Sequence, residues 1–224
     1  MRTLTKEMQK ALTPAVALKL LEEGNERFAN NKRLNLNCKE QLEETSDRQY
    51  PFAVVLSCMD SRTSSELLFD QGIGDVFSIR IAGNICNPDI LGSMEFGCKT
   101  AGAKIIVVLG HTQCGAIKGA CDQIEMGSFT GLLSKITPAV DEELATKENR
   151  SSENPQFVDN VAVINVKLTV QAITEQSPIL QKMIELGEIG IIGGLYDVSS
   201  GIVSFFPDTK STALLSPKQT TSQL

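Results

Sequence analysis

A histidine and a cysteine three positions apart, His111 and Cys114, are the first residues in this sequence that could do chemistry together. At a turn between a strand and a helix, such a pair can close on one Zn²⁺, which accepts imidazole nitrogen at about 2.0–2.1 Å and thiolate sulfur at about 2.3 Å. Two ligands alone would hold the ion poorly, so a third is needed. The alternative is that His111 makes an ordinary hydrogen bond and Cys114 is an inert buried thiol.

Two other cysteines compete for the place of the third ligand. Cys58 and Cys86 each follow a predicted strand, and either would complete a set of one histidine and two cysteines. Three protein ligands with one open position is the pattern of catalytic zinc, whereas structural zinc normally has four. Spacing alone does not decide between the two cysteines.

A carboxylate and a guanidinium, Asp60 and Arg62, lie two residues apart just after Cys58. On a protein surface such a pair is usually an ion pair worth about 0–1 kcal/mol. Beside a metal it gains a role: Asp60 can bind the ion as a fourth ligand, or Arg62 can hold it off the ion. Held off, Asp60 can accept a hydrogen bond from a metal-bound hydroxide.

The elements that must position these residues alternate between strands and helices. Short apolar runs rich in β-branched residues predict strands at 52–57, 76–81, 105–109, 189–195 and 202–206. Apolar spacing predicts helices at 13–31, 64–70, 90–102, 116–126, 131–147 and 156–186, and a loop with a short helix at 32–50. We therefore expect an α/β fold, a doubly wound, mostly parallel central sheet of four to five strands with helices on both faces.

Three polar clusters, at 58–62, 82–86 and 110–115, immediately follow predicted strands. Because ligands bind outside the carboxyl ends of parallel strands, all three are expected to open onto one edge of the sheet. We divide the chain into an amino-terminal helical arm (1–31), a single α/β domain that carries the candidate zinc-binding catalytic site (32–208) and a polar, frayed tail (209–224).

Composition excludes several classes of partner. The formal net charge is −6 and the basic residues are scattered, so nucleic acid is not an expected partner. No apolar run approaches the roughly 20 residues that span a bilayer, so no membrane is expected either. The first residues lack the apolar segment of a secretion signal, which indicates a cytoplasmic location. In that compartment six cysteines do not indicate a disulfide framework.

The motifs around these residues resemble the paired signature of the β-class carbonic anhydrases. The signature consists of Cys58-Met59-Asp60-Ser61-Arg62 and His111-Thr112-Gln113-Cys114-Gly115. The similarity to bacterial members extends over 51–122, with the stretches 69–72, 80–84 and 92–96, and also includes 24–28 in the first predicted helix. Beyond about residue 149 it rests on the closing strand at 193–197.

This resemblance implies zinc-dependent, reversible hydration of carbon dioxide to bicarbonate and a proton by attack of zinc-bound hydroxide. It implies that Cys58, His111 and Cys114 are the Zn²⁺ ligands, which removes Cys86 from the competition. It also implies that Asp60 and Arg62 are catalytic, with Asp60 a fourth ligand only in a closed form of the site. Relatives that favour the closed form use a tryptophan-containing bicarbonate pocket, and this chain has no tryptophan, so we expect the open form.

The resemblance further implies a substrate pocket with Gln71, Phe96 and Gly115, in which Phe96 serves the neighbouring subunit's site. Family members are homodimers or dimers of dimers, so a second copy of the chain is the expected partner besides carbon dioxide and bicarbonate. Two other functions stay open. One is hydrolysis of carbon disulfide or carbonyl sulfide on the same scaffold, and the other is a non-catalytic structural zinc domain with four protein ligands.

Overall fold

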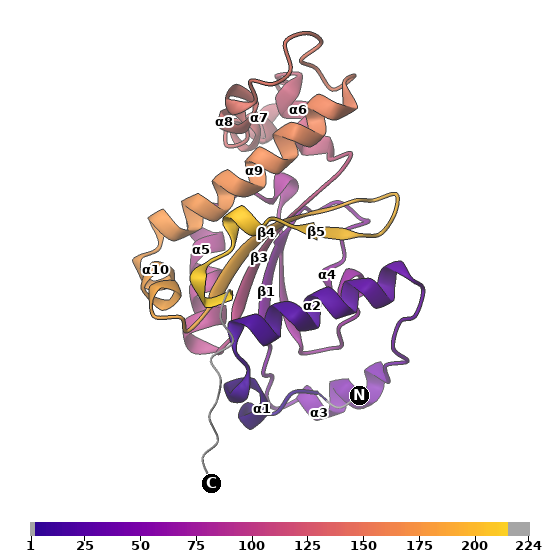
Figure 1. Cartoon of the computed structure of the whole chain (residues 1–224), viewed down its shortest axis with the longest axis vertical. Coiled ribbons are helices and arrows are strands. Elements are labelled where there is room, and N and C mark those ends of the chain that lie inside the picture. The colour runs from indigo at the N-terminus through magenta and orange to yellow at the C-terminus, as the bar shows by residue number, and fades with distance from the viewer. Residues whose placement is uncertain (1–2, 215–224) are drawn as a thin grey trace.

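Five strands form one sheet at the centre of the molecule, in the order β2-β1-β3-β4-β5 (Figure 1). The structure is a computed structural model that describes residues 3–214. The strands are β1 (Ala53–Ser57), β2 (Val76–Arg80), β3 (Ile105–His111), β4 (Gly190–Tyr196) and β5 (Val203–Phe205). The first four are parallel, and β5 runs antiparallel to β4. The predicted mostly parallel sheet is confirmed.

Helices surround this sheet in the order that the sequence predicted, with an additional helix at the amino terminus and with two of the predicted helices each divided in two. They are α1 (Lys6–Ala11), α2 (Pro14–Ala29), α3 (Cys38–Thr45), α4 (Ser65–Leu68), α5 (Pro88–Glu95), α6 (Gly115–Cys121), α7 (Gly127–Leu133), α8 (Thr137–Glu142), α9 (Pro155–Gln176) and α10 (Pro178–Glu185). A π-helical turn (Phe96–Thr100) extends α5, and 3₁₀ turns lie at Ala82–Asn84, Pro207–Thr209 and Thr212–Leu214. None of the helices within residues 3–214 is both long and apolar enough to cross a bilayer.

Both faces of the sheet are buried at its three central strands, β1, β3 and β4, which explains why these strands read as continuous apolar runs. Successive strand residues point to opposite faces. One face packs against α5, α9 and α10 through Val54, Leu56, Ile106, Val108 and Ile191. The other packs against α2 and α4 through Ala53, Val55, Ile105, Val107 and Leu109. Helices on both faces are therefore confirmed (Figure 1).

Helix α2 begins where its sequence predicts. The side chain of Thr13 accepts a hydrogen bond from the backbone N–H of Val16 at 3.3 Å, and Pro14 takes the first helical position, where its missing N–H has no consequence. Ala17 and Leu21 are fully buried in the core on the α2 side of the sheet. The amino-terminal helix is thus anchored to the sheet of its own chain.

The helix predicted over 131–147 is interrupted between α7 and α8 and is wrong at its carboxyl end. Helix α8 ends at Glu142, and the chain then runs without helix to α9. The buried carboxylate of Glu143 accepts hydrogen bonds from the backbone N–H and the hydroxyl of Thr146 and pairs with Arg150 at 2.8 Å. These contacts replace the backbone hydrogen bonds that a continuing helix would make.

The helix predicted over 156–186 divides in two. Helix α9 ends at Gln176, and the hydroxyl of Ser177 accepts a hydrogen bond from the N–H of Leu180 at 3.2 Å and so begins α10. Pro178 disfavours helical backbone at the residue before it, which explains the break. The predicted helices 90–102 and 116–126 are also shorter as α-helices, ending at Glu95 and Cys121.

The tail predicted to be frayed from Thr209 is ordered as far as the structure describes it. The hydroxyl of Thr209 accepts a hydrogen bond from the N–H of Gly193 at 2.8 Å, and Leu214 is 4% exposed in the core on the α2 side. That part of the prediction is wrong for 209–214, because one apolar side chain anchors the segment. The rest of the predicted tail, 215–224, lies outside the described residues.

Candidate metal centre

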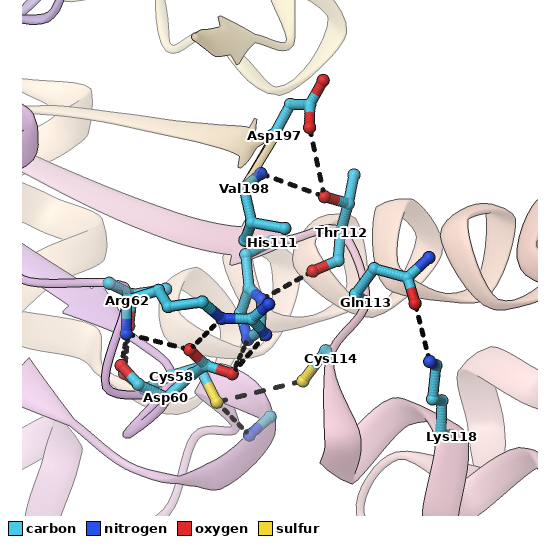
Figure 2. Close-up of polar contacts among 12 residues, drawn as sticks. Cys58, Asp60, Arg62, His111, Thr112, Gln113, Cys114, Lys118, Asp197 and Val198 are labelled. Atoms are coloured by element: carbon cyan, nitrogen blue, oxygen red, sulfur yellow. Dashed lines mark hydrogen bonds and ion pairs between the residues drawn. The ribbon is translucent and has the colours of Figure 1, made fainter. Parts of the chain in front are cut away.

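Two adjacent strand ends and one helix start bring Cys58, His111 and Cys114 together. Cys58 follows β1, His111 is the last residue of β3, and Cys114 directly precedes α6. Strands β1 and β3 are parallel neighbours, so Cys58 and His111 emerge side by side at their carboxyl ends. One ligand atom from each residue lies within 4.8 Å of the others, and all three residues are buried. The two sulfur atoms are 3.9 Å apart (Figure 2).

The competing thiol of Cys86 is not part of this group. Within residues 3–214, only Cys58, His111 and Cys114 form a cluster of three or more potential metal ligands. The Cys86 sulfur lies 4.0 Å from the backbone oxygen of Asn87, and burial raises the pKa of its thiol. The segment before Cys86 does reach the cluster, because the backbone N–H of Gly83 points at the Cys58 sulfur at 3.4 Å. Gly83 has φ +67°, and a Cβ there would lie 2.6 Å from Cδ1 of Ile136.

The ring of His111 is held so that one nitrogen is free to bind a cation. Its Nδ1 lies 2.8 Å from the backbone oxygen of Thr112. A carbonyl oxygen only accepts hydrogen bonds, so Nδ1 carries the proton and Nε2 keeps a lone pair. Nε2 is buried and has no hydrogen-bond partner among the described residues. A buried acceptor without a partner is costly, and a metal ion would satisfy it.

The two thiols also fit a cation. The hydrogen bond from Cys114 is the main cause that lowers the pKa of Cys58, assisted by His111 and the N–H of Gly83. The pKa of Cys114 is raised, by that contact with Cys58 and by burial. A second thiolate so near the first needs a positive charge between the two sulfurs. Two thiolates and one imidazole are a typical donor set for Zn²⁺.

Asp60 and Arg62 form a bidentate pair next to these ligands. The Nε and Nη2 atoms of Arg62 donate to the two carboxylate oxygens of Asp60 at 2.9 and 2.8 Å (Figure 2). These hydrogen bonds hold the pKa of Asp60 well below its usual range. The Oδ2 atom of Asp60 lies 3.9 Å from Nε2 of His111, so the carboxylate faces the cluster while both of its oxygens bind Arg62.

Arg80 supports the same loop and was not among the predicted site residues. It lies at the end of β2, in register with Ser57, and donates to the backbone oxygens of Asp60 at 2.5 Å and Cys58 at 3.3 Å. Its position at a strand end next to β1 could have indicated this role, had the strand order been known.

The three predicted pocket residues differ in how close they lie to the cluster of candidate metal ligands. Gly115 is the first residue of α6, next to Cys114. The amide of Gln71 donates to the backbone oxygen of Phe69 at 2.6 Å and lines a hollow near Leu34, to which none of the three candidate ligands contributes.

Phe96 is 55% exposed and lies beside β2, the strand at one edge of the sheet. Its ring lies 6.2 Å from that of Phe77, centroid to centroid. A hollow there, lined by Phe77, Ile79 and Phe96, also excludes the three candidate ligands. Within one chain, only Gly115 of the three pocket candidates adjoins the cluster.

Comparisons with known proteins agree with this arrangement. A family model described as carbonic anhydrase matches residues 53–203. Carbonic anhydrase 2 of Mycobacterium tuberculosis is 32% identical over 194 residues, which cover 84% of this chain and 90% of that protein. The β-carbonic anhydrase CafA of Aspergillus fumigatus has a similar structure, with a TM-score of 0.67 and 27% identity over 86% of this chain and 89% of that one.

A second solved structure extends the likeness of fold. One of two tetrameric β-carbonic anhydrases from Sordaria macrospora has a TM-score of 0.68 at 22% identity, covering 83% of this chain and 94% of that one. The family match over most of the chain and the identity to the mycobacterial enzyme carry the assignment. This chain is therefore an enzyme that belongs to the carbonic anhydrase family, in its β class.

Proposed function

We propose that this enzyme binds Zn²⁺ through Cys58, His111 and Cys114 and catalyses the reversible hydration of carbon dioxide to bicarbonate and a proton. The observation that carries the proposal is the buried Nε2 of His111, which lacks a hydrogen-bond partner among the described residues and belongs to a cluster with two thiols. A zinc ion with three protein ligands supplies a nucleophile near neutral pH, because it lowers the pKa of a coordinated water.

In this proposal Asp60 orients the oxygen nucleophile. Its carboxylate faces the cluster, 3.9 Å from Nε2 of His111, and can accept a hydrogen bond from that oxygen. Arg62 holds the carboxylate in this direction with two hydrogen bonds. Asp60 would have to give up at least one of them to become a fourth ligand. The pairing therefore supports the open form, in which one coordination position is left for solvent.

We also propose that the chain works as a homodimer or a dimer of dimers. The Sordaria enzyme is described as tetrameric, and Phe96 of this chain is exposed on the outer side of β2. In such an assembly Phe96 would contribute to the neighbouring subunit's pocket, and Gln71 and Gly115 would contribute to substrate binding. All six cysteines are free thiols, which is consistent with a cytoplasmic location.

The test is stopped-flow hydration of carbon dioxide by the purified, zinc-analysed protein, with carbonyl sulfide and carbon disulfide assayed in parallel. We expect about one zinc per chain, rapid hydration of carbon dioxide, and loss of activity on removal of zinc that is restored when zinc is returned. Faster turnover of either sulfur compound would assign the chain to hydrolysis of that compound. Stoichiometric zinc with no turnover of any of the three would indicate a structural metal.

A further inference from the structure

The turn that joins β4 to β5 holds the residue that follows His111. Thr112 donates its backbone N–H to the oxygen of Tyr196, the last residue of β4, at 2.9 Å. Its hydroxyl accepts a hydrogen bond from the N–H of Val198 at 3.1 Å and lies 3.5 Å from Oδ1 of Asp197 (Figure 2). Thr112 is therefore attached to β4 through its backbone and to the β4–β5 turn through its side chain.

The turn that makes these contacts is itself well fixed. Oδ1 of Asp197 accepts hydrogen bonds from the backbone N–H of Ser199 at 2.8 Å and from its hydroxyl at 2.7 Å. Its other oxygen accepts one from the hydroxyl of Ser200 at 3.1 Å. The backbone groups of Asp197 and Ile202 close the turn with a further hydrogen bond at 2.9 Å. The carboxylate that faces Thr112 thus has a defined direction.

The carbonyl of Thr112 needs such support because the next residue is in an unfavourable conformation. Gln113 has φ +57°, which a residue with a side chain adopts reluctantly. The peptide between Thr112 and Gln113 carries the oxygen that accepts the Nδ1 proton of His111. A flip of this peptide would relax the turn and remove that acceptor.

We infer that Thr112 is a positioning residue. Its hydroxyl is anchored to the β4–β5 turn at Val198 and Asp197, and this anchor directs the carbonyl oxygen of Thr112 toward Nδ1 of His111. This inference rests on the proposed function, in which Nε2 of His111 binds zinc. The hydrogen bond keeps the proton on Nδ1 and fixes the plane of the ring, so Nε2 presents its lone pair to the ion. Partners of this kind orient metal-binding histidines, and their loss typically lowers metal affinity about 10- to 100-fold.

The chain offers a matched control at Thr209. Its hydroxyl also accepts a backbone N–H from β4, that of Gly193 at 2.8 Å, and donates to the oxygen of Phe206 at 2.8 Å. Thr209 therefore fastens another segment to the same strand without a contact to His111. A purely structural role for Thr112 would make Thr112→Val and Thr209→Val behave alike.

The experiment uses the fact that the chain has a single histidine. Selective ¹⁵N labelling of histidine gives two ring signals, both from His111, in the metal-free and the zinc-loaded protein. Zinc affinity is measured in parallel by competition with a chromogenic chelator. We expect the wild type, Thr209→Val and Thr112→Ser to keep the proton on Nδ1 and to bind zinc within about threefold of one another. We expect Thr112→Val to show a mixture of tautomers without metal and a zinc affinity lower by about 10- to 100-fold.

Thr112→Val with an unchanged tautomer and the affinity of Thr209→Val would overturn the inference. If Thr112→Val does not fold, the wild-type ring signals decide, because a metal-free His111 protonated on Nε2 contradicts the inference. A wild type that binds no zinc would instead refute the proposed function. The ring signals of the metal-free protein would then still show whether Thr112 sets the tautomer.

Discussion

Replacing Asp60 by asparagine separates the contribution of this residue to catalysis from its contribution to the stability of the fold. Asparagine has nearly the same shape and keeps one oxygen that can accept from Arg62, but it loses the negative charge. The two side chains are 18% and 48% exposed, and an ion pair this exposed contributes about 0–1 kcal/mol. In a chain of this length that corresponds to a fall in Tm of no more than about 4 °C.

The expected effect on turnover is larger. If Asp60 orients the nucleophile, its loss should lower kcat/KM on the order of 100-fold, as loss of a group that orients metal chemistry does. A factor of 100 corresponds to about 2.7 kcal/mol of transition-state stabilisation. The catalytic cost therefore exceeds the structural cost by well over 1 kcal/mol, and this difference is the quantity to measure.

The assay is stopped-flow hydration of carbon dioxide with a pH indicator, with thermal unfolding of the same samples. Asp208→Asn is the matched control, because Asp208 forms an exposed ion pair with Lys167 at 2.6 Å that has no contact with the cluster. We expect this control to keep wild-type turnover. A kcat/KM of Asp60→Asn within twofold of the wild type would refute the assigned role. A Tm lowered by much more than 4 °C would show that the pair is mainly structural.

Three further predictions concern the ligand set, a buried carboxyl group and the packing beneath His111. Cys114→Ser should lose zinc and activity, whereas Cys86→Ser should keep both; metal analysis and turnover test this, and equal zinc loss in the two variants would contradict it. Burial raises the pKa of Asp75, so the unfolded chain releases this proton first and stability falls as pH rises above about 4. Asp75→Asn, which can still accept from the N–H of Gly72, should therefore gain stability over the wild type between pH 4 and pH 7 in urea titrations, and a constant difference would contradict this. Gly110→Ala would bring a Cβ within 2.6 Å of Val166 in the core and should cost about 1–3 kcal/mol of unfolding free energy, whereas Gly131→Ala, with nothing within 4 Å, should not destabilise; equal Tm values would refute this.

The parts of the fold that depend on local sequence could be predicted well. The β-branched run before Cys58 becomes strand β1, and the Thr13-Pro14 pair starts α2, because burial on both faces and helix capping are read within a few residues. The meeting of Cys58 with His111 could also be anticipated, since the carboxyl ends of parallel strands share one edge.

Features that depend on distant contacts could not be predicted. The chain at 143–147 has a helical pattern but forms a loop, because Glu143 binds Thr146 and Arg150 instead. Leu214 is an apolar residue in a mostly polar segment, and its burial depends on contacts with the folded core on the α2 side.

The roles of Arg80 and Thr112 depend on which strands are neighbours. Arg80 reaches the Cys58 loop because β2 lies beside β1, and Thr112 is held because β4 lies beside β3. The apolar pattern of the individual strands does not determine the order of the strands in the sheet. Neither contact could therefore be predicted from that pattern.

The most direct test of the central claim is X-ray absorption spectroscopy at the zinc edge of the purified enzyme. Binding by Cys58, His111 and Cys114 with one open position predicts two sulfur atoms at about 2.3 Å, one imidazole nitrogen at about 2.0–2.1 Å and one further light atom from solvent. A spectrum with three or four sulfur ligands, or a protein that neither contains nor takes up zinc, would contradict the claim.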